Sequence, residues 1–164
     1  MLAKPTFSIF VAYASADVPL ADTLREEVRT RCPIQRDVGL DLWSDVRIGA
    51  GEPWEERIAA ALAGADGGLV LLSPALLAND FVARVELPAL ARTGRVVPAA
   101  LVPVDLKRYD LRELARLQVF LHRPPRSRRR LSFRECRGAE RDHFCDGLVA
   151  ALVDRLADGG DAAA

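Results

Sequence analysis

The sequence predicts an α/β fold, a three-layer sandwich in which helices flank a parallel sheet of four or five strands. Short apolar runs typical of strands alternate with amphipathic helical patterns along 164 residues, a length that suits one domain. The run at residues 68–73 carries no charge, as expected of a central strand that helices cover on both sides.

The first strand and the first helix follow from the opening residues. Residues 7–13 are β-rich, and Asp17 after them is of a type that can cap a helix. Leu20, Leu24 and Val28 then recur at every fourth position, which predicts a helix with one buried face. The positions between them hold Arg25, Glu26, Glu27 and Arg29.

A second strand and helix follow, joined by a loop. Residues 40–44 predict the strand, and residues 45–53 contain two glycines and a proline, which indicates a loop. The next helix begins at Trp54, and Trp54, Ile58 and Leu62 mark one of its faces.

The second half predicts two or three further elements. Residues 95–102 resemble the uncharged strand before them, and Pro98 within them is easiest to place near a strand end or on an edge strand. Residues 119–121 are a candidate for a last short strand. A terminal helix begins near Asp142, and its apolar face holds Phe144, Leu148 and Leu152.

Composition narrows the class of protein. The 23 basic and 23 acidic residues cancel, so no global field attracts nucleic acid or an anionic membrane. The three cysteines are odd in number and form no CxxC pair, which fits a reducing compartment and predicts a cytoplasmic location. Residues 7–13 are too short to span a membrane and lack a cleavage site, so we expect no export signal.

Glu86 is the strongest candidate for a functional residue, because it is an acid in an apolar helical segment just after the uncharged strand. Two interpretations remain open. The carboxylate pairs with Arg84 or Arg92 on a solvated helix face, or it is the reacting centre of a site.

Other candidates follow the carboxyl ends of the predicted strands, where open α/β sheets bind their ligands. Aromatic rings among them suit stacking on flat rings, and an arginine suits a phosphate. The candidates for substrate binding are Tyr13, Ser15, Arg47, Trp54 and Phe81. Each also has a plainer interpretation, as packing, turn or solvated loop residue.

The usual devices for holding a nucleotide cofactor are missing. The chain has no GxxxxGK[ST] segment and no GxGxxG segment after the first strand. A bound nucleotide is therefore expected to be a substrate that is cut, and we expect no cofactor. The widely separated His122 and His143 do not suggest a metal site. The arginine-rich residues 123–130 lack interleaved aromatic residues, so we expect a solvated loop and no nucleic acid contact.

Five segments resemble, in order, the Toll/interleukin-1 receptor (TIR) domains, and among them the bacterial members. They are residues 9–17, 43–45, 51–54, 71–74 and the pair 80–81 with 86–87. The resemblance covers about residues 6–157 and implies a flavodoxin-like sheet. We expect a TIR domain over residues 1–157, with 158–164 as a flexible tail or the start of a linker.

Two features depart from the family pattern. Phe81 stands five residues before Glu86, where many members have an aromatic residue four before the glutamate. Ala14 and Ser15 stand where some catalytic relatives carry basic residues, so a phosphate contact must come from elsewhere, with Arg47 as the candidate.

The resemblance implies an enzyme that cleaves NAD+ between nicotinamide and ribose, with Glu86 as the essential residue and NAD+ as substrate. It also implies self-assembly with other TIR domains, a fused or separate sensor, a role in prokaryotic antiphage immunity, and a loop at 45–53 that contacts a neighbouring domain. Breaking the bond builds positive charge on the ribose, which a carboxylate stabilises. Hydrolysis to ADP-ribose and cyclisation to a cyclic isomer share this step, and a non-catalytic interaction module is the alternative.

Overall fold

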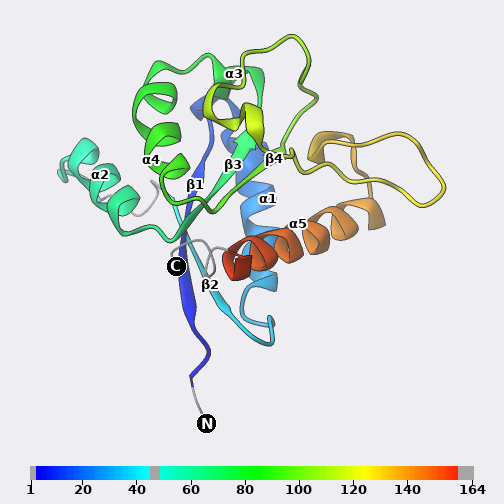
Figure 1. Ribbon diagram of the computed structural model, residues 1–164, viewed down its shortest axis with the longest axis horizontal. Helices are drawn as coiled ribbons and strands as arrows, with labels where there is room; N and C mark the ends of the chain where they lie inside the picture. Colours follow the sequence, from blue (N-terminus) through cyan, green and yellow to red (C-terminus); the bar gives the residue numbers. More distant parts are fainter. Residues whose placement is uncertain (1–2, 45–48, 159–164) are drawn as a thin grey trace.

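Four parallel strands form the centre of the fold in the computed structural model, which describes residues 3–44 and 49–158. They are β1 (Thr6–Ala12), β2 (Gly39–Trp43), β3 (Gly67–Leu72) and β4 (Val96–Ala100). Their order in the sheet is β2-β1-β3-β4, and every pair is parallel (Figure 1). The predicted α/β class with a parallel, flavodoxin-like sheet is confirmed, with four strands.

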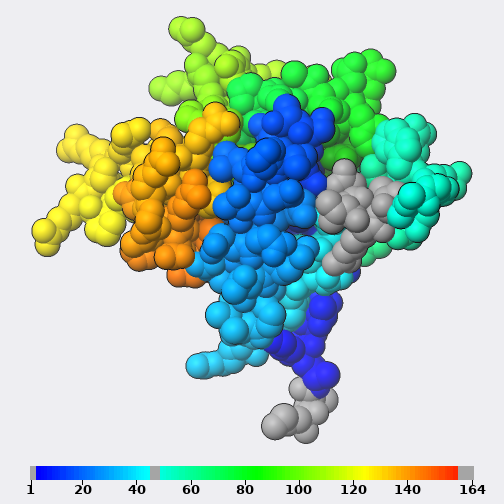
Figure 2. Space-filling model, turned by 180° about the vertical axis from the view of Figure 1, so that it is seen from behind, coloured from blue at the N-terminus to red at the C-terminus, as the bar shows by residue number. Residues whose placement is uncertain are grey.

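Helices cover both faces of this sheet. One face carries α1 (Val18–Arg31) and α5 (Ala139–Asp158), which lie side by side in Figures 1 and 2. The other face carries α2, the short helix α3, a π-helical turn η3, and α4. Their bounds are α2 (Trp54–Gly64), α3 (Pro74–Leu77), η3 (Val82–Glu86) and α4 (Leu87–Ala91).

Alternation along β1 divides the core into two halves. Ile9 and Val11 pack in the half beneath α1 and α5, whereas Phe10 and Ala12 pack in the half beneath α2 and α4. This is the period of two that a strand imposes. Because helices cover both halves, β3 is buried along its whole length, as its uncharged sequence predicts.

Pro98 lies on the edge strand β4, in accordance with the prediction. Its carbonyl accepts a hydrogen bond from the Phe120 N–H at 2.7 Å, so the ring nitrogen, which carries no hydrogen, faces away from β3. No bond between β3 and β4 is therefore lost.

The proline also limits the predicted last strand at residues 119–121. Phe120 bonds to β4 through one bridge to Ala99, with a second hydrogen bond from the Ala100 N–H to the Phe120 carbonyl at 3.0 Å. To extend this pairing toward Gln118, the backbone N–H of Pro98 would have to donate a hydrogen bond, and proline has no backbone N–H. The segment is thus an isolated bridge, and the sheet has four strands.

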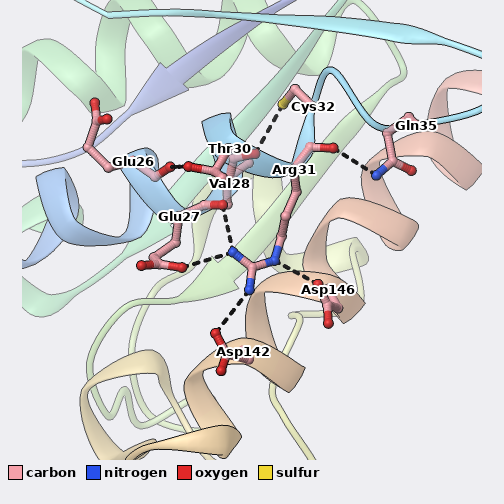
Figure 3. Close-up of polar contacts among 9 residues, drawn as sticks. All are labelled: Glu26, Glu27, Val28, Thr30, Arg31, Cys32, Gln35, Asp142 and Asp146. Atoms are coloured by element: carbon pink, nitrogen blue, oxygen red, sulfur yellow. Dashed lines mark hydrogen bonds and ion pairs between the residues drawn. The ribbon is translucent and has the colours of Figure 1, made fainter.

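Arg31 joins the ends of α1 and α5 (Figure 3). Its guanidinium donates to Asp146 at 2.6 Å and to Asp142 at 3.1 Å, both on α5. It also donates to the Glu27 carboxylate, one turn earlier on α1, at 2.9 Å. One side chain therefore fixes the packing of two helices that are far apart in sequence.

Three short helices complete the described elements: η1 (Ser15–Asp17), η4 (Arg112–Arg116) and η5 (Phe133–Glu135). The arginine-rich loop at residues 123–130 protrudes beside α5, as Figures 1 and 2 show. The terminal helix begins at Ala139, three residues before the predicted start near Asp142. Across residues 3–44 and 49–158, no helix is long and apolar enough to cross a membrane.

Candidate active site

Glu86 is the last residue of η3, and it is buried, with 8% of its surface exposed. It lines a cavity of about 40 Å³ at the carboxyl ends of β1 and β2. The interpretation of Glu86 as an acid on a solvated helix face is therefore wrong. The other residues that line this cavity are Phe10, Val11, Tyr13, Trp43 and Ile58.

A π-helical turn sets the position of Glu86. The Leu87 N–H donates to the carbonyl of Val82, five residues earlier, where an α-helix would use the residue four earlier. Such a turn holds one extra residue, so a separation of five positions across it corresponds to four in an α-helix. The extra residue between Phe81 and Glu86 is accommodated in this way. The predicted regular helix at this place is interrupted, and single π turns are frequent at functional sites.

Pro88 gives a physical reason for the turn. In a regular α-helix its ring would press against the carbonyl of Arg84, four residues earlier. A wider turn before the proline relieves this contact, and α4 then continues to Ala91.

Stacked aromatic rings form one wall of the cavity. The rings of Phe10 and Trp43 lie 5.1 Å apart between centroids and only 19° from parallel. Neither was among the predicted site residues. The available signal was the position of Trp43 at the carboxyl end of the second strand, where α/β folds bind their ligands.

Tyr13 lies just beyond β1 on the same cavity, and α1 holds its phenol. The Arg25 guanidinium donates a hydrogen bond of 2.9 Å to the Tyr13 hydroxyl oxygen. Of the five residues predicted to bind substrate, Tyr13 is the one that the described part of the structure places on the cavity with Glu86.

Trp54 and Phe81 form a pair outside the residues that line this cavity. Their ring centroids are 5.3 Å apart with planes tilted by 57°. Trp54 is 50% exposed, whereas Ile58 and Leu62 of the same helix are buried, so the face that these three residues mark is buried only from Ile58 onward. An exposed indole resting on a second ring is an accessible apolar surface beside η3.

Ser15 is exposed in η1, and it is not among the described residues that line the cavity. Arg47 lies outside the described residues. Asp17 precedes α1 but makes no capping hydrogen bond with its side chain. Its carboxylate instead accepts a hydrogen bond from Ser73, whose hydroxyl oxygen in turn accepts from the Leu76 N–H at 3.0 Å.

The size of the Glu86 cavity limits what it holds in this conformation. About 40 Å³ has room for little more than a water molecule, whereas pockets for small-molecule ligands span roughly 300–1,000 Å³. Three larger hollows of about 510 to 590 Å³ lie elsewhere, and Glu86 lines none of them. We place the candidate site at the smaller cavity of Glu86 for a chemical reason: a buried carboxylate and aromatic rings line that cavity together.

Metal ligands do not gather in the described part of the chain. No group of three or more His, Cys, Asp or Glu side chains there is arranged to hold an ion. The rings of His122 and His143, far apart in sequence, lie 6.0 Å apart between centroids, but no third ligand joins them among these residues.

Comparisons with known proteins agree with this architecture. The uncharacterized protein y4lF of Sinorhizobium fredii (strain NBRC 101917 / NGR234) is 28% identical over 103 residues. The match covers 63% of this chain and 31% of that protein, so the chain spans about a third of the length of this relative. The model of the TIR domain family matches residues 9–143, which include β2, β3, β4, the carboxyl-terminal part of β1 and the candidate site. The chain belongs to the TIR domain family.

Proposed function

We propose that this TIR domain, over residues 1–157, is an NAD+ nucleosidase that cuts the bond between nicotinamide and ribose, with Glu86 as the catalytic carboxylate. Among the described residues, Glu86 is the only carboxylate in the buried interior, and this observation carries the proposal. Burial of an ionisable group is costly unless the group is paired and hydrogen-bonded, and such groups cluster at functional sites, so a buried acid on an aromatic cavity suits a reacting centre.

The proposed reaction needs few groups. The bond between ribose C1′ and the nicotinamide nitrogen breaks, and its electron pair leaves with the nicotinamide, which becomes neutral. No strong general acid is required. The positive charge that develops on the ribose is stabilised by the Glu86 carboxylate. Water then adds to C1′ and loses a proton to solvent, which gives ADP-ribose. In the cyclising variant, a nucleophile on the same ADP-ribose takes the place of water.

We propose that self-assembly of TIR domains opens or completes the site, because the cavity of about 40 Å³ is too small for NAD+. The loop before α2 is suited to such a change. Gly51 within it has a φ of 84°, a conformation that favours glycine, and nothing lies within 4 Å of the position of a β-carbon there. In this proposal Tyr13, Ser15, Arg47, Trp54 and Phe81 bind the substrate, with Arg47 on a phosphate.

The proposed setting is prokaryotic antiphage immunity in the cytoplasm, where a fused or separate sensor would bring TIR domains together. Activation by assembly requires no change in the chemistry at Glu86. It requires only a shift of the population toward the conformation that admits substrate.

The experiment compares free nicotinamide released from NAD+ by the protein alone and by the protein clustered on a multivalent support. We expect turnover on clustering, and a loss of at least about 100-fold in Glu86→Gln, the usual scale for removing an electrostatic stabiliser. Glu113→Gln is the matched control, since Glu113 is exposed and does not line the Glu86 cavity. Circular dichroism and thermal unfolding of both variants report on the fold.

A second candidate is a non-catalytic module that acts by contacts between TIR domains, and the small volume of the Glu86 cavity favours it. Glu86 would then be structural. Absence of nicotinamide release under every clustering condition would decide for this candidate. Full activity of Glu86→Gln would instead show that Glu86 is not the catalytic carboxylate. Self-association of the wild type, measured by light scattering, tests the module directly.

A further inference from the structure

Arg25 breaks the pattern of its helix. The core-facing side of α1 is formed by Ala21, Leu24 and Val28, and Arg25 lies on the same side with only 5% of its surface exposed. The sequence pattern placed it among the charged residues between the apolar positions. An apolar side chain would avoid the cost of removing a charge from water, so the buried arginine calls for a specific reason.

The contacts of Arg25 converge on one tyrosine. Its Nη1 donates to the Tyr13 hydroxyl at 2.9 Å, and its Cζ lies over the Tyr13 ring, 5.2 Å from the centroid. The carboxylate of Asp22 lies 3.0 Å from the same nitrogen, without the alignment of a hydrogen bond. Asp22 thus balances the charge, while Tyr13 takes the directed contacts.

Tyr13 connects this buried cation to the cavity of Glu86. It follows β1 directly, so its backbone is fixed by the central sheet, and its side chain lines the cavity. Two contacts from one rigid helix, at the hydroxyl and over the ring, restrict both the position and the rotation of the phenol. From this geometry we infer that Arg25 is a positioning residue, which holds Tyr13 in the orientation that meets the substrate.

The functional part of this inference rests on the proposed cleavage of NAD+. A ring that is held before the substrate arrives loses little conformational freedom on binding, which improves affinity. Arg25 does not line the cavity among the described residues, so it acts through Tyr13. Loss of Arg25 should raise KM and leave kcat nearly unchanged.

The first test reads the Tyr13 ring without any turnover. The chain has two tyrosines, and Tyr109 is exposed, so Tyr109→Phe leaves Tyr13 as a single reporter for ¹⁹F NMR after labelling with 3-fluorotyrosine. In this background, Arg25→Met should shift the resonance and average the two ring orientations. Arg25→Lys, which keeps a donor and a charge, should restore part of the original signal.

Arg29→Met is the matched control on the same helix. Arg29 lies one turn after Arg25, is half exposed, and pairs only with the exposed Glu26 among the described residues. This variant should leave the Tyr13 resonance unchanged. An unchanged resonance in Arg25→Met would overturn the inference.

The second test uses kinetics of the clustered protein with NAD+. We expect Arg25→Met to raise KM about tenfold, the scale of one lost hydrogen bond to a charged group, with kcat within about twofold. Tyr13→Phe combined with Arg25→Met should be no worse than the more impaired single variant, since both act on one contact. Additive losses, or a fall in kcat alone, would contradict positioning through Tyr13.

The proposed cleavage of NAD+ and the inference about Arg25 can be refuted independently of each other. If the wild type releases no nicotinamide while the Tyr13 resonance responds to Arg25→Met, the proposed reaction is wrong and the structural part of the inference stands. If the wild type is active and Arg25→Met changes the resonance but not KM, the role in substrate binding is wrong. Thermal unfolding of each variant identifies an effect that comes from loss of the fold.

Discussion

Two buried ionisable side chains, those of Arg25 and Glu86, reach the same region from opposite faces of the sheet. Arg25 belongs to α1, which packs on the half of the core that includes Ile9. Glu86 belongs to η3, on the half that includes Phe10. Tyr13, just beyond the end of the strand between these halves, contacts Arg25 and shares a cavity with Glu86. Tyr13, at the end of this strand, therefore links two side chains that the sheet would otherwise separate.

Glu135 provides a test of electrostatics at the scale of one residue. Its carboxylate accepts hydrogen bonds from the Ser132 N–H at 2.8 Å, from the Ser132 hydroxyl at 2.9 Å and from Arg129 at 2.9 Å. The backbone hydrogen bond from Ser132 is the main cause that holds the pKa of Glu135 below its usual value, with the hydroxyl and Arg129 adding to it. This is the capping box of η5.

A lowered pKa in the folded state means that ionised Glu135 stabilises the fold above the unfolded pKa of about 4.3, and that this stability is lost as pH falls through the folded pKa. We expect Glu135→Gln to lower the free energy of unfolding by about 1 kcal/mol at pH 7, after allowance for solvent screening. The deficit should shrink toward zero below about pH 4. Urea unfolding across this pH range measures it, and a deficit independent of pH would contradict the assignment.

At the scale of elements, the helix that carries Glu86 combines a π turn with a proline. Asn79 begins this segment, because its side chain accepts from the Val82 N–H at 3.0 Å and its carbonyl accepts from the Ala83 N–H at 3.0 Å. The π turn follows at once, and Pro88 comes just after it. The turn therefore serves two ends: it places Glu86 on the cavity, and it makes room for the proline ring.

Deletion of Val85 tests this account. Val85 is an exposed residue of the turn, so its removal should close the π turn to an α-helix without emptying the core. Pro88 would then lie within a regular helix, and we expect a loss of about 3 kcal/mol in the free energy of unfolding. The deletion combined with Pro88→Ala should recover most of this loss, as measured by urea unfolding. A deletion variant as stable as the wild type would show that the turn does not relieve Pro88.

The contact between α1 and α5 is a second property of elements. Arg31 binds two carboxylates on α5 and one on its own helix, and its side chain is mostly buried while those carboxylates are largely exposed. We expect Arg31→Met to lower the free energy of unfolding by about 1–2 kcal/mol in low salt, since networks of ion pairs exceed isolated surface pairs. The difference should diminish near 1 M salt.

Arg29→Met is the control for this experiment, because the ion pair of Arg29 with Glu26 is exposed on both sides. We expect it to change the free energy of unfolding by less than about 0.5 kcal/mol. Equal effects of Arg29→Met and Arg31→Met would show that the link between the two helices adds nothing to stability.

At the scale of the whole molecule, the sequence predicts the fold well because hydrophobic periodicity is a local property. The uncharged run before Ser73 marks β3, and the spacing of Leu24 and Val28 marks α1. The candidate site is harder to predict. The π turn at Glu86 and the pairing of Arg25 with Tyr13 depend on contacts between distant segments, which no local pattern contains.

The exposed Trp54 illustrates the same limit. Its spacing from Ile58 places both residues on one side of α2, but Trp54 is the first residue of that helix and half of its surface is exposed. Periodicity specifies which residues share a side of a helix. It does not specify how far the neighbouring layer extends, so residues at helix ends are those for which burial is predicted least well.

The three cysteines report on the cooperativity of the whole domain. Cys32, Cys136 and Cys145 are buried, and burial is the main cause that raises their pKa to about 11, 11 and 12. At pH 8 the three thiols of the folded protein should therefore be protonated and inaccessible, so a reagent such as N-ethylmaleimide should not label them. All three should react quickly in denaturant, where thiols regain an ordinary pKa near 8.5.

Cys32 lies at the end of α1, Cys145 on α5, and Cys136 in the segment before α5, so together they sample separate parts of one core. If the domain opens as one unit, all three should become labelled at a single rate as urea is raised, as followed by mass spectrometry after quenching. Faster labelling of Cys136 alone would show instead that the segment between β4 and α5 opens before the sheet. Because α1 and α5 share the Arg31 contacts, Arg31→Met should raise the labelling of Cys32 and Cys145 together.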